Sequence, residues 1–154
     1  MAFCKKCGAE LDENAKQCPA CGAPVEEEKS SAEKVFADLN NTADTTGEYD
    51  PKDIENNKVM GILAYIGILF LVPLLAAPKS KFARFHTNQG LVLFLAEIIL
   101  GVAAGILSLI PIVGWIVRGV VGVVGLVLMI LGIVNAANGK AKELPVIGKF
   151  KLLK

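Results

Sequence analysis

Four cysteines in two close pairs carry the clearest chemistry in this sequence. Cys4 and Cys7 form one pair and Cys18 and Cys21 the other, with ten residues between the pairs. Thiolates at this Cys-x2-Cys spacing are typical of a structural zinc site, in which four sulfurs surround one ion as a tetrahedron. The cysteines are therefore predicted to bind one structural zinc ion. Because four thiolates close the coordination shell, no catalytic position is left open.

A glycine, Gly8 or Gly22, follows each pair directly. Glycine lets the backbone turn tightly with positive φ, so that amides can point at the thiolate sulfurs. Around the cysteines only Phe3, Leu11 and Val25 could add to an apolar core. That is too little for about 25 residues to fold without a metal or cross-links.

Three other uses of the cysteines compete with zinc. Disulfides need an oxidising compartment and give no reason for the paired Cys-x2-Cys-Gly pattern. A thioredoxin-like redox site needs a βαβ setting, which the surrounding sequence does not provide. Iron bound as in rubredoxin uses the same four ligands, so the sequence defines metal binding more firmly than it defines the metal.

Three polar side chains interrupt the apolar second half of the chain: His86, Glu97 and Arg118. A carboxylate inside a bilayer is costly, so Glu97 is predicted to face protein or water, either as a structural hydrogen-bonding group or as a proton or ion relay. Arg118 follows Pro111 by about two helical turns and is predicted to extend its charge to the nearer membrane interface. His86 is predicted to be a polar cap at the entrance of a helix.

Three apolar stretches could position these residues inside a membrane. Val59–Ala77 contains 19 residues without a charge, and Gly90–Ile110 and Ile112–Ala137 follow it. About 20 apolar residues of helix cross the ~30 Å hydrocarbon layer. The sequence therefore predicts three transmembrane helices, the first kinked near its end by Pro73.

Small residues recur along two of these stretches. Glu97, Gly101 and Gly105 lie four apart on the second, as do Arg118 and Gly122 on the third. Residues at this spacing share one helix face, and small side chains there let two helix backbones approach closely. We therefore expect the stripes to form the contact between these two helices and to shield Glu97 from lipid. A substrate path along the stripes is the alternative.

Charge divides the chain into parts. Residues 1–58 hold 13 acidic residues against 7 lysines, whereas residues 59–154 hold 9 basic residues against 2 acidic ones. We predict a small zinc ribbon of β-knuckles at 1–24, an acidic flexible tether with a short helix at 25–53, and an all-α membrane domain of three transmembrane helices with a basic tail at 54–154. A net charge of +1 gives no reason to expect a nucleic-acid partner.

Two segments resemble known families. Met1–Pro24 resembles the zinc-ribbon heads of many prokaryotic membrane and regulatory proteins, except that Gln17 stands where such heads often carry an aromatic residue. Asn57–Tyr65, Lys81–Gly90 and Ala136–Gly139 are similar to a family of small prokaryotic membrane proteins, distantly grouped with the inner-envelope subunit of the chloroplast protein-import translocon. This second resemblance implies a polytopic membrane fold and no established enzyme chemistry.

Basic residues also predict how the chain is oriented in a prokaryotic cell membrane. Lys79, Lys81 and Arg84 precede the second apolar stretch, and five lysines follow the third. The positive-inside rule places both groups in the cytoplasm, so the C-terminal tail is predicted to be cytoplasmic. Three full spans would then place the ribbon outside, whereas reduced thiolates and the lack of an apolar signal segment in residues 1–24 favour the inside. A re-entrant Val59–Ala77 or an anaerobic cell would reconcile the two, and the side of the ribbon stays open.

Together these features favour a non-enzymatic integral membrane protein. The ribbon would bind a protein partner, and the helices, embedded in the lipid bilayer, would anchor or assemble a complex. The alternative is a component of a transport or protein-translocation system that uses the polar stripe around Glu97. An enzyme is not expected, because the chain shows no nucleophile–base pair and no open metal position. A second copy of the chain is a further candidate partner.

Overall fold

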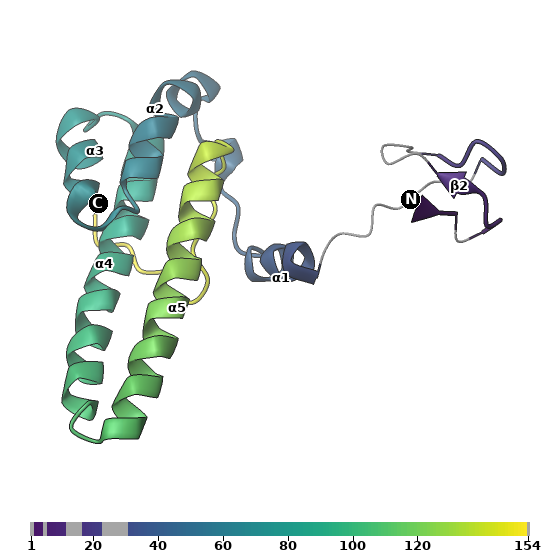
Figure 1. Ribbon diagram of the computed structural model, residues 1–154. Helices are drawn as coiled ribbons and strands as arrows, with labels where there is room; N and C mark the ends of the chain where they lie inside the picture. Colours follow the sequence, from purple (N-terminus) through teal and green to yellow (C-terminus); the bar gives the residue numbers. More distant parts are fainter. Residues whose placement is uncertain (1, 5, 12–16, 23–30, 154) are drawn as a thin grey trace. The chain divides into compact units, whose positions relative to one another are not determined.

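The computed structural model describes residues 2–4, 6–11, 17–22 and 31–153. The chain divides into two compact units, Met1–Val35 and Phe36–Lys154. In the first unit, strand β1 (Ala2–Phe3) pairs antiparallel with β2 (Glu10–Leu11), so that Ala2 lies opposite Leu11 and Phe3 opposite Glu10 (Figure 1). This short ribbon carries the first cysteine pair between its two strands.

Helices make up the second unit. In chain order the elements from residue 31 onward are α1 (Ser31–Leu39), η1 (Thr46–Glu48), α2 (Pro51–Leu63), η2 (Gly67–Phe70), α3 (Leu71–Ala76), α4 (Lys81–Leu107) and α5 (Pro111–Ala137). The short helix expected in the tether is thus present as α1.

Side chains cap two of these helices. Asp50 accepts a hydrogen bond from the Lys52 amide at 2.8 Å and, with proline at the first helical position, starts α2. Ser80 accepts from the Ala83 amide at 3.0 Å and starts α4. Long helices α4 and α5 lie side by side and antiparallel, joined by a turn at 108–110 (Figure 1).

Two helices are long and apolar enough to cross a membrane, Lys81–Leu107 and Ile112–Ala137. Val59–Ala77 does not form one continuous helix, because α2 ends at Leu63 and the chain turns at Gly67, whose φ is +51°, so the expected third span is not shown. Glycine adopts this left-handed conformation without the steric cost that other residues meet. The chain then continues as the short elements η2 and α3.

Contacts along α4 show that α2 and α3 fold back on each other as a helical hairpin. Near the start of α4, the Phe82 amide donates to Asp53 Oδ2 at 3.0 Å. Further along, the rings of Phe70 and Phe94 lie 5.5 Å apart. The end of α3 then returns to the first half of α2, since Ala76 lines a cavity together with Asp53. The chain therefore enters and leaves the hairpin at the same end of α4.

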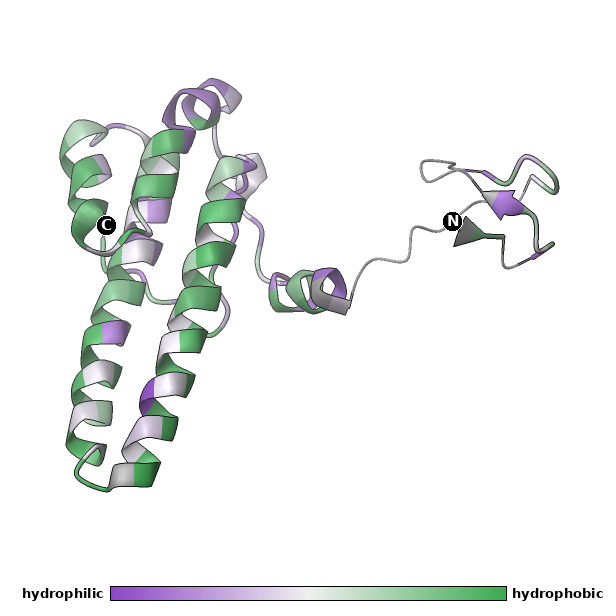
Figure 2. Cartoon of the chain, in the orientation of Figure 1, coloured by the Kyte–Doolittle hydropathy of each residue, from purple (hydrophilic) through white to green (hydrophobic). Residues whose placement is uncertain are grey.

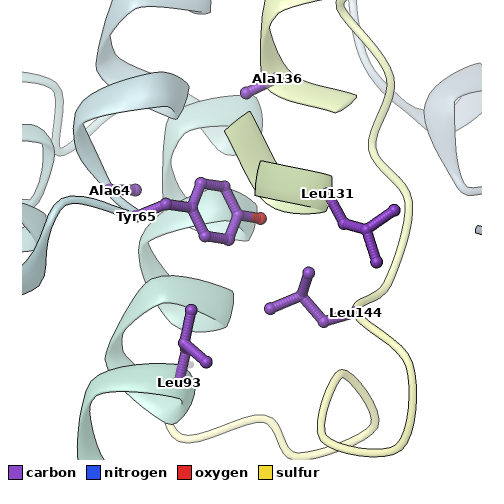
Figure 3. Packing of buried hydrophobic residues seen from close by; sticks show 6 residues of the cluster. All are labelled: Ala64, Tyr65, Leu93, Leu131, Ala136 and Leu144. Carbon is purple, nitrogen blue, oxygen red and sulfur yellow. The ribbon is translucent and has the colours of Figure 1, made fainter. Parts of the chain in front are cut away.

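Apolar core packing is concentrated where this α2–α3 hairpin, the start of α4, the end of α5 and the C-terminal segment meet. Figure 3 shows the buried cluster, formed by Ala64, Tyr65, Leu93, Leu131, Ala136 and Leu144. Two glycines make the close approach there: a Cβ on Gly90 would lie 1.8 Å from the Ala64 carbonyl oxygen, and one on Gly132 would lie 2.3 Å from the Tyr65 ring. We call this packed end of the unit the cap.

Beyond the cap, residues 95–130 form a bare helical hairpin that we call the stem. Its large apolar side chains are mostly exposed, among them Ile99, Ile106, Ile112 and Trp115. Figure 2 shows the resulting hydrophobic colouring along both helices. A surface of this kind is suited to hydrocarbon rather than to water.

Part of the predicted flexible tether belongs to the cap. The side-chain amides of Asn40 and Asn135 donate to each other's oxygens at 2.9 and 2.8 Å. Close by, the Thr45 amide donates to the Ala141 carbonyl at 3.0 Å, and Lys142 Nζ donates to the Asn40 carbonyl at 2.9 Å. The segment that leads toward the ribbon and the C-terminal tail therefore leave the stem at the same end.

Candidate metal centre and intramembrane polar residues

All four predicted zinc ligands come together in the ribbon. Their sulfurs lie within 4.8 Å of one another, with 3.7 Å between Cys4 and Cys21 and 3.5 Å between Cys7 and Cys18. Four sulfurs placed 2.3 Å from one zinc ion at the corners of a tetrahedron lie about 3.8 Å apart, whereas a disulfide bond is about 2.05 Å long. The spacing fits a single tetrahedral ion and does not fit disulfides.

Two matching turns place the sulfurs. The Gly8 amide donates to the Cys4 carbonyl at 2.8 Å, and the Gly22 amide donates to the Cys18 carbonyl at 2.9 Å. The φ angles of these glycines are +73° and +65°. A Cβ on either glycine would meet nothing within 4 Å, so a side chain would fit there. Glycine is favoured at these positions because of the positive φ angle of the backbone.

The backbone around Cys4 favours the thiolate. Amides of Lys6 and Cys7 point at its sulfur and lower the pKa of the Cys4 thiol to about 6, which helps because zinc binds the deprotonated form. Cys4 and Cys18 are buried, whereas Cys7 and Cys21 are exposed, so one side of the centre faces solvent. A zinc ion held by these four residues would cross-link the two turns.

His86 lies in the cap, fully buried. Its Nδ1 is 2.8 Å from the Tyr65 hydroxyl, and its ring meets that of Phe82 edge-on with centroids 4.6 Å apart. Its Nε2 has no hydrogen-bond partner among the described residues. The prediction that His86 caps a helix entrance is wrong, because Ser80 caps α4 and His86 lies in the second turn of that helix, and the sequence gave no indication that Tyr65 would be its partner.

The two amide residues after His86 hold the C-terminal segment. Gln89 Nε2 donates to the Gly148 carbonyl at 2.9 Å, and Gln89 Oε1 accepts from the Leu144 amide at 3.2 Å. Asn88 Nδ2 donates to the Phe150 carbonyl at 2.8 Å. Only the position of Asn88 and Gln89 close to His86 marked these two residues in the sequence, and it did not indicate that they would bind the C-terminal segment. Their role is to satisfy the backbone of an irregular segment.

Glu97 and Arg118 lie on the stem and are both exposed. Glu97 points toward α5, because its Oε1 would lie 2.8 Å from a Cβ on Gly125. The expected close packing along the rest of the stripe is wrong, since a Cβ on Gly101 or Gly122 would meet nothing within 4 Å. The carboxylate is thus beside the neighbouring helix but not enclosed by it. The structure does not bring His86 together with these two charges.

A four-thiolate ribbon joined to an apolar helical hairpin defines a zinc-ribbon membrane protein, and the comparisons with known proteins agree. A zinc-ribbon domain profile matches residues 3–25. Residues 56–151 match the MamF/MmsF profile, and the chain belongs to this magnetosome magnetite crystal formation protein family.

Among curated proteins, the chain is similar to a UPF0132 membrane protein of Methanocaldococcus jannaschii. The two are 36% identical over 93 residues, which cover 57% of this chain and 62% of the relative. No solved structure matches the chain. None of these matches bears on the expected relation to the chloroplast import translocon, which stays a prediction.

Proposed function

We propose that this protein is a non-enzymatic membrane anchor that presents its zinc ribbon to a protein partner. The observation that carries the proposal is the separation of the chain into two units, one a closed four-thiolate ribbon and the other a membrane hairpin. A closed shell of four thiolates supplies structure and leaves no open coordination position for a substrate. Within its described residues the ribbon has almost no apolar core, so we infer that the metal holds the fold that displays its surface.

The geometry of the cap supports a cytoplasmic ribbon. The tether at Asn40 and the tail at Lys142 leave the stem at the same end, so a two-span topology puts both on one side of the membrane. The lysines and arginine around α4 and in the tail make that side the cytoplasm. Reduced thiolates are stable in the cytoplasm. Under this topology the positive-inside rule and the reduced state of the cysteines therefore favour the same side of the membrane for the ribbon.

Reporter fusions test this topology. A fluorescent reporter active only in the cytoplasm should give signal when fused either before Met1 or after Lys154, and a phosphatase active only outside should be silent at both positions. Opposite signals from the two ends would mean that Val59–Ala77 crosses the membrane as a third span, and the proposed side of the ribbon would then be wrong.

Capture from detergent-solubilised membranes tests the anchoring role. Bound proteins would be compared for the wild type, Cys18→Ser and Glu97→Gln, with membrane insertion measured for each. We expect a defined protein to be retained by the wild type and by Glu97→Gln, and to be lost with Cys18→Ser because the ribbon no longer holds zinc. Retention by Cys18→Ser, or loss on Glu97→Gln, contradicts the proposal.

A transport or translocation component is the second candidate, favoured by the exposed carboxylate of Glu97 on the stem. Under this alternative Glu97→Gln abolishes flux in proteoliposomes while the fold is kept. The family description also raises mineral formation. That role would need ligands for iron on the far side of the membrane, and the turn there, Ser108–Ile110, carries no carboxylate.

We also propose that a second copy of the chain covers part of the stem. Glu97 and Arg118 are opposite charges on its exposed surface, and charges inside a membrane usually pair with one another. In a dimer each carboxylate would lie near the guanidinium of the neighbouring copy. Chemical cross-linking in native membranes should give a dimer that Arg118→Leu weakens; a monomer in the wild type contradicts the proposal.

A further inference from the structure

A cavity of about 420 Å³ opens at the cap, between the first turns of α4, the segment around η1 and the C-terminal tail. Three cationic side chains line it: Lys81 and Arg84 from α4, and Lys151 from the tail. Among the residues that the structure describes, Glu48 is the only acidic one that lines the cavity. The cavity is therefore cationic overall, which suits an anionic group.

The cavity also has an apolar wall. Tyr49 and Phe85 line it, with their rings edge-on and their centroids 5.9 Å apart. Aromatic rings of this kind are enriched where a membrane protein passes through the lipid headgroups. A ligand with a charged head and an apolar body would meet cations on one side and rings on the other.

The depth of the cavity agrees with such a ligand. At 1.5 Å per residue, about 20 residues of helix cross a hydrocarbon layer of ~30 Å. A stretch of about 20 residues that is counted back along α4 from Ile110, at the turn, ends near Gly90. The headgroup layer adds roughly 5–7 Å, which reaches about Phe85. Phe85 therefore lies at the level of the lipid headgroups, and Lys81, about one helical turn further out, can extend its long side chain back toward them.

One wall of the cavity is held in place. Asn88 Oδ1 accepts hydrogen bonds from the amides of Leu152 and Leu153 at 2.7 and 2.9 Å, while its Nδ2 donates to the Phe150 carbonyl. These bonds lie on both sides of Lys151 along the chain and bind the tail to α4. Asn88 itself is buried. The lysine is thus presented by an ordered segment, which lowers the entropic cost of binding.

From these observations we infer that the cavity binds the phosphate headgroup of an anionic phospholipid, with Lys81 and Lys151 contacting the phosphate from opposite walls. Arg84 already has an interaction partner within the chain, so it is not needed for the assignment. Basic pockets at the cytoplasmic ends of membrane helices have the chemistry to select such lipids over zwitterionic ones. The inference is independent of whether the ribbon has a protein partner.

Thermal unfolding of the full chain in detergent, with added lipid, tests the assignment. Phosphatidylglycerol should raise the midpoint of the wild type by about 3 °C or more, because a ligand bound only to the folded state stabilises it. Phosphatidylcholine with the same acyl chains should have little effect. Inorganic phosphate should have little effect too, because it lacks the apolar body that the rings contact.

Matched variants locate the site. Lys81→Gln and Lys151→Gln should each remove at least half of the shift, whereas Lys149→Gln, a neighbouring exposed tail lysine outside the cavity, should retain it. Native mass spectrometry should show fewer retained phosphatidylglycerol molecules in the first two variants only. An equal loss in Lys149→Gln, an equal response to phosphatidylcholine, or a full response to inorganic phosphate overturns the inference.

Discussion

The ribbon and the cap are held together in opposite ways. In the ribbon every ligand lies within the first 21 residues, and the two turns repeat one local pattern. In the cap the determining hydrogen bonds join distant parts of the chain, with a sequence separation of 95 for the pair Asn40 and Asn135 and of 59 for the pair Gln89 and Gly148. A metal site built from residues close in the sequence can be predicted from a short motif, whereas hydrogen bonds between distant residues cannot.

The two regions also differ in what resists unfolding. Cys4 and Cys18 are the only buried apolar residues described in the ribbon, with Ala9 packed against them. The cap has an apolar cluster drawn from α2, α4, α5 and the tail, in addition to its hydrogen bonds. The ribbon should therefore depend on metal and the cap on packing, and the following experiments test that difference.

Removal of the metal should have the largest effect, and only on the ribbon. A strong chelator, or Cys18→Ser, is expected to unfold the ribbon completely, since structural zinc supplies roughly 10 kcal/mol or more of folding free energy. Hydrogen exchange of the Gly8 and Gly22 amides should become fast, while helical circular dichroism and the thermal midpoint of the membrane unit stay unchanged. A ribbon that keeps its amide protection without metal contradicts the comparison.

Within the membrane unit, two glycines of α4 should respond in opposite directions to alanine. Gly90→Ala places a Cβ against the Ala64 carbonyl, which belongs to the backbone and cannot move aside, so we expect a loss of about 3 kcal/mol or more. Gly101→Ala meets open space and should be neutral or stabilising by about 0.5–1 kcal/mol. Thermal or detergent unfolding measures both. Equal effects would mean that α2 does not pack on Gly90.

A smaller loss is expected when one polar pair of the cap is broken. Asn135→Ala removes both hydrogen bonds with Asn40 and should cost about 1–3 kcal/mol, because polar groups in a largely buried site lose their partner. Asn138→Ala is the control, since it loses a single bond to the Val134 carbonyl of its own helix on the exposed surface. A double-mutant cycle with Asn40→Ala should show coupling; additive effects would show that the pair contributes nothing specific.

The smallest predicted effect concerns a single turn of the ribbon. Gly8→Ala forces a side chain into a φ of +73°, at a cost of about 1–2 kcal/mol. Because folding and metal binding are coupled, this should weaken zinc affinity about 5- to 30-fold in competition with a chelating dye. Lys6→Ala, at an exposed position in the same turn, should change the affinity much less.

The sequence predicted what depends on local pattern. It identified the four ligands, the existence of both long helices and the approach of Glu97 to α5. It failed to predict the break in the helix within Val59–Ala77, because composition alone does not separate a helical hairpin from a single helix. The contact of Ala64 with Gly90, which accompanies this break, exists only after folding. It also overestimated the packing of Gly101 and Gly122, since a helical stripe shows which residues share a face but not what covers it.

The α2–α3 hairpin has a consequence for biosynthesis. Val59–Ala77 leaves the ribosome before α4 and α5, and it is strongly apolar. The surface on which it packs, which includes Gly90 and Gly132, is made only later. Until then its apolar side chains lack that partner surface, so a defect at Gly90 should act on membrane insertion as well as on stability.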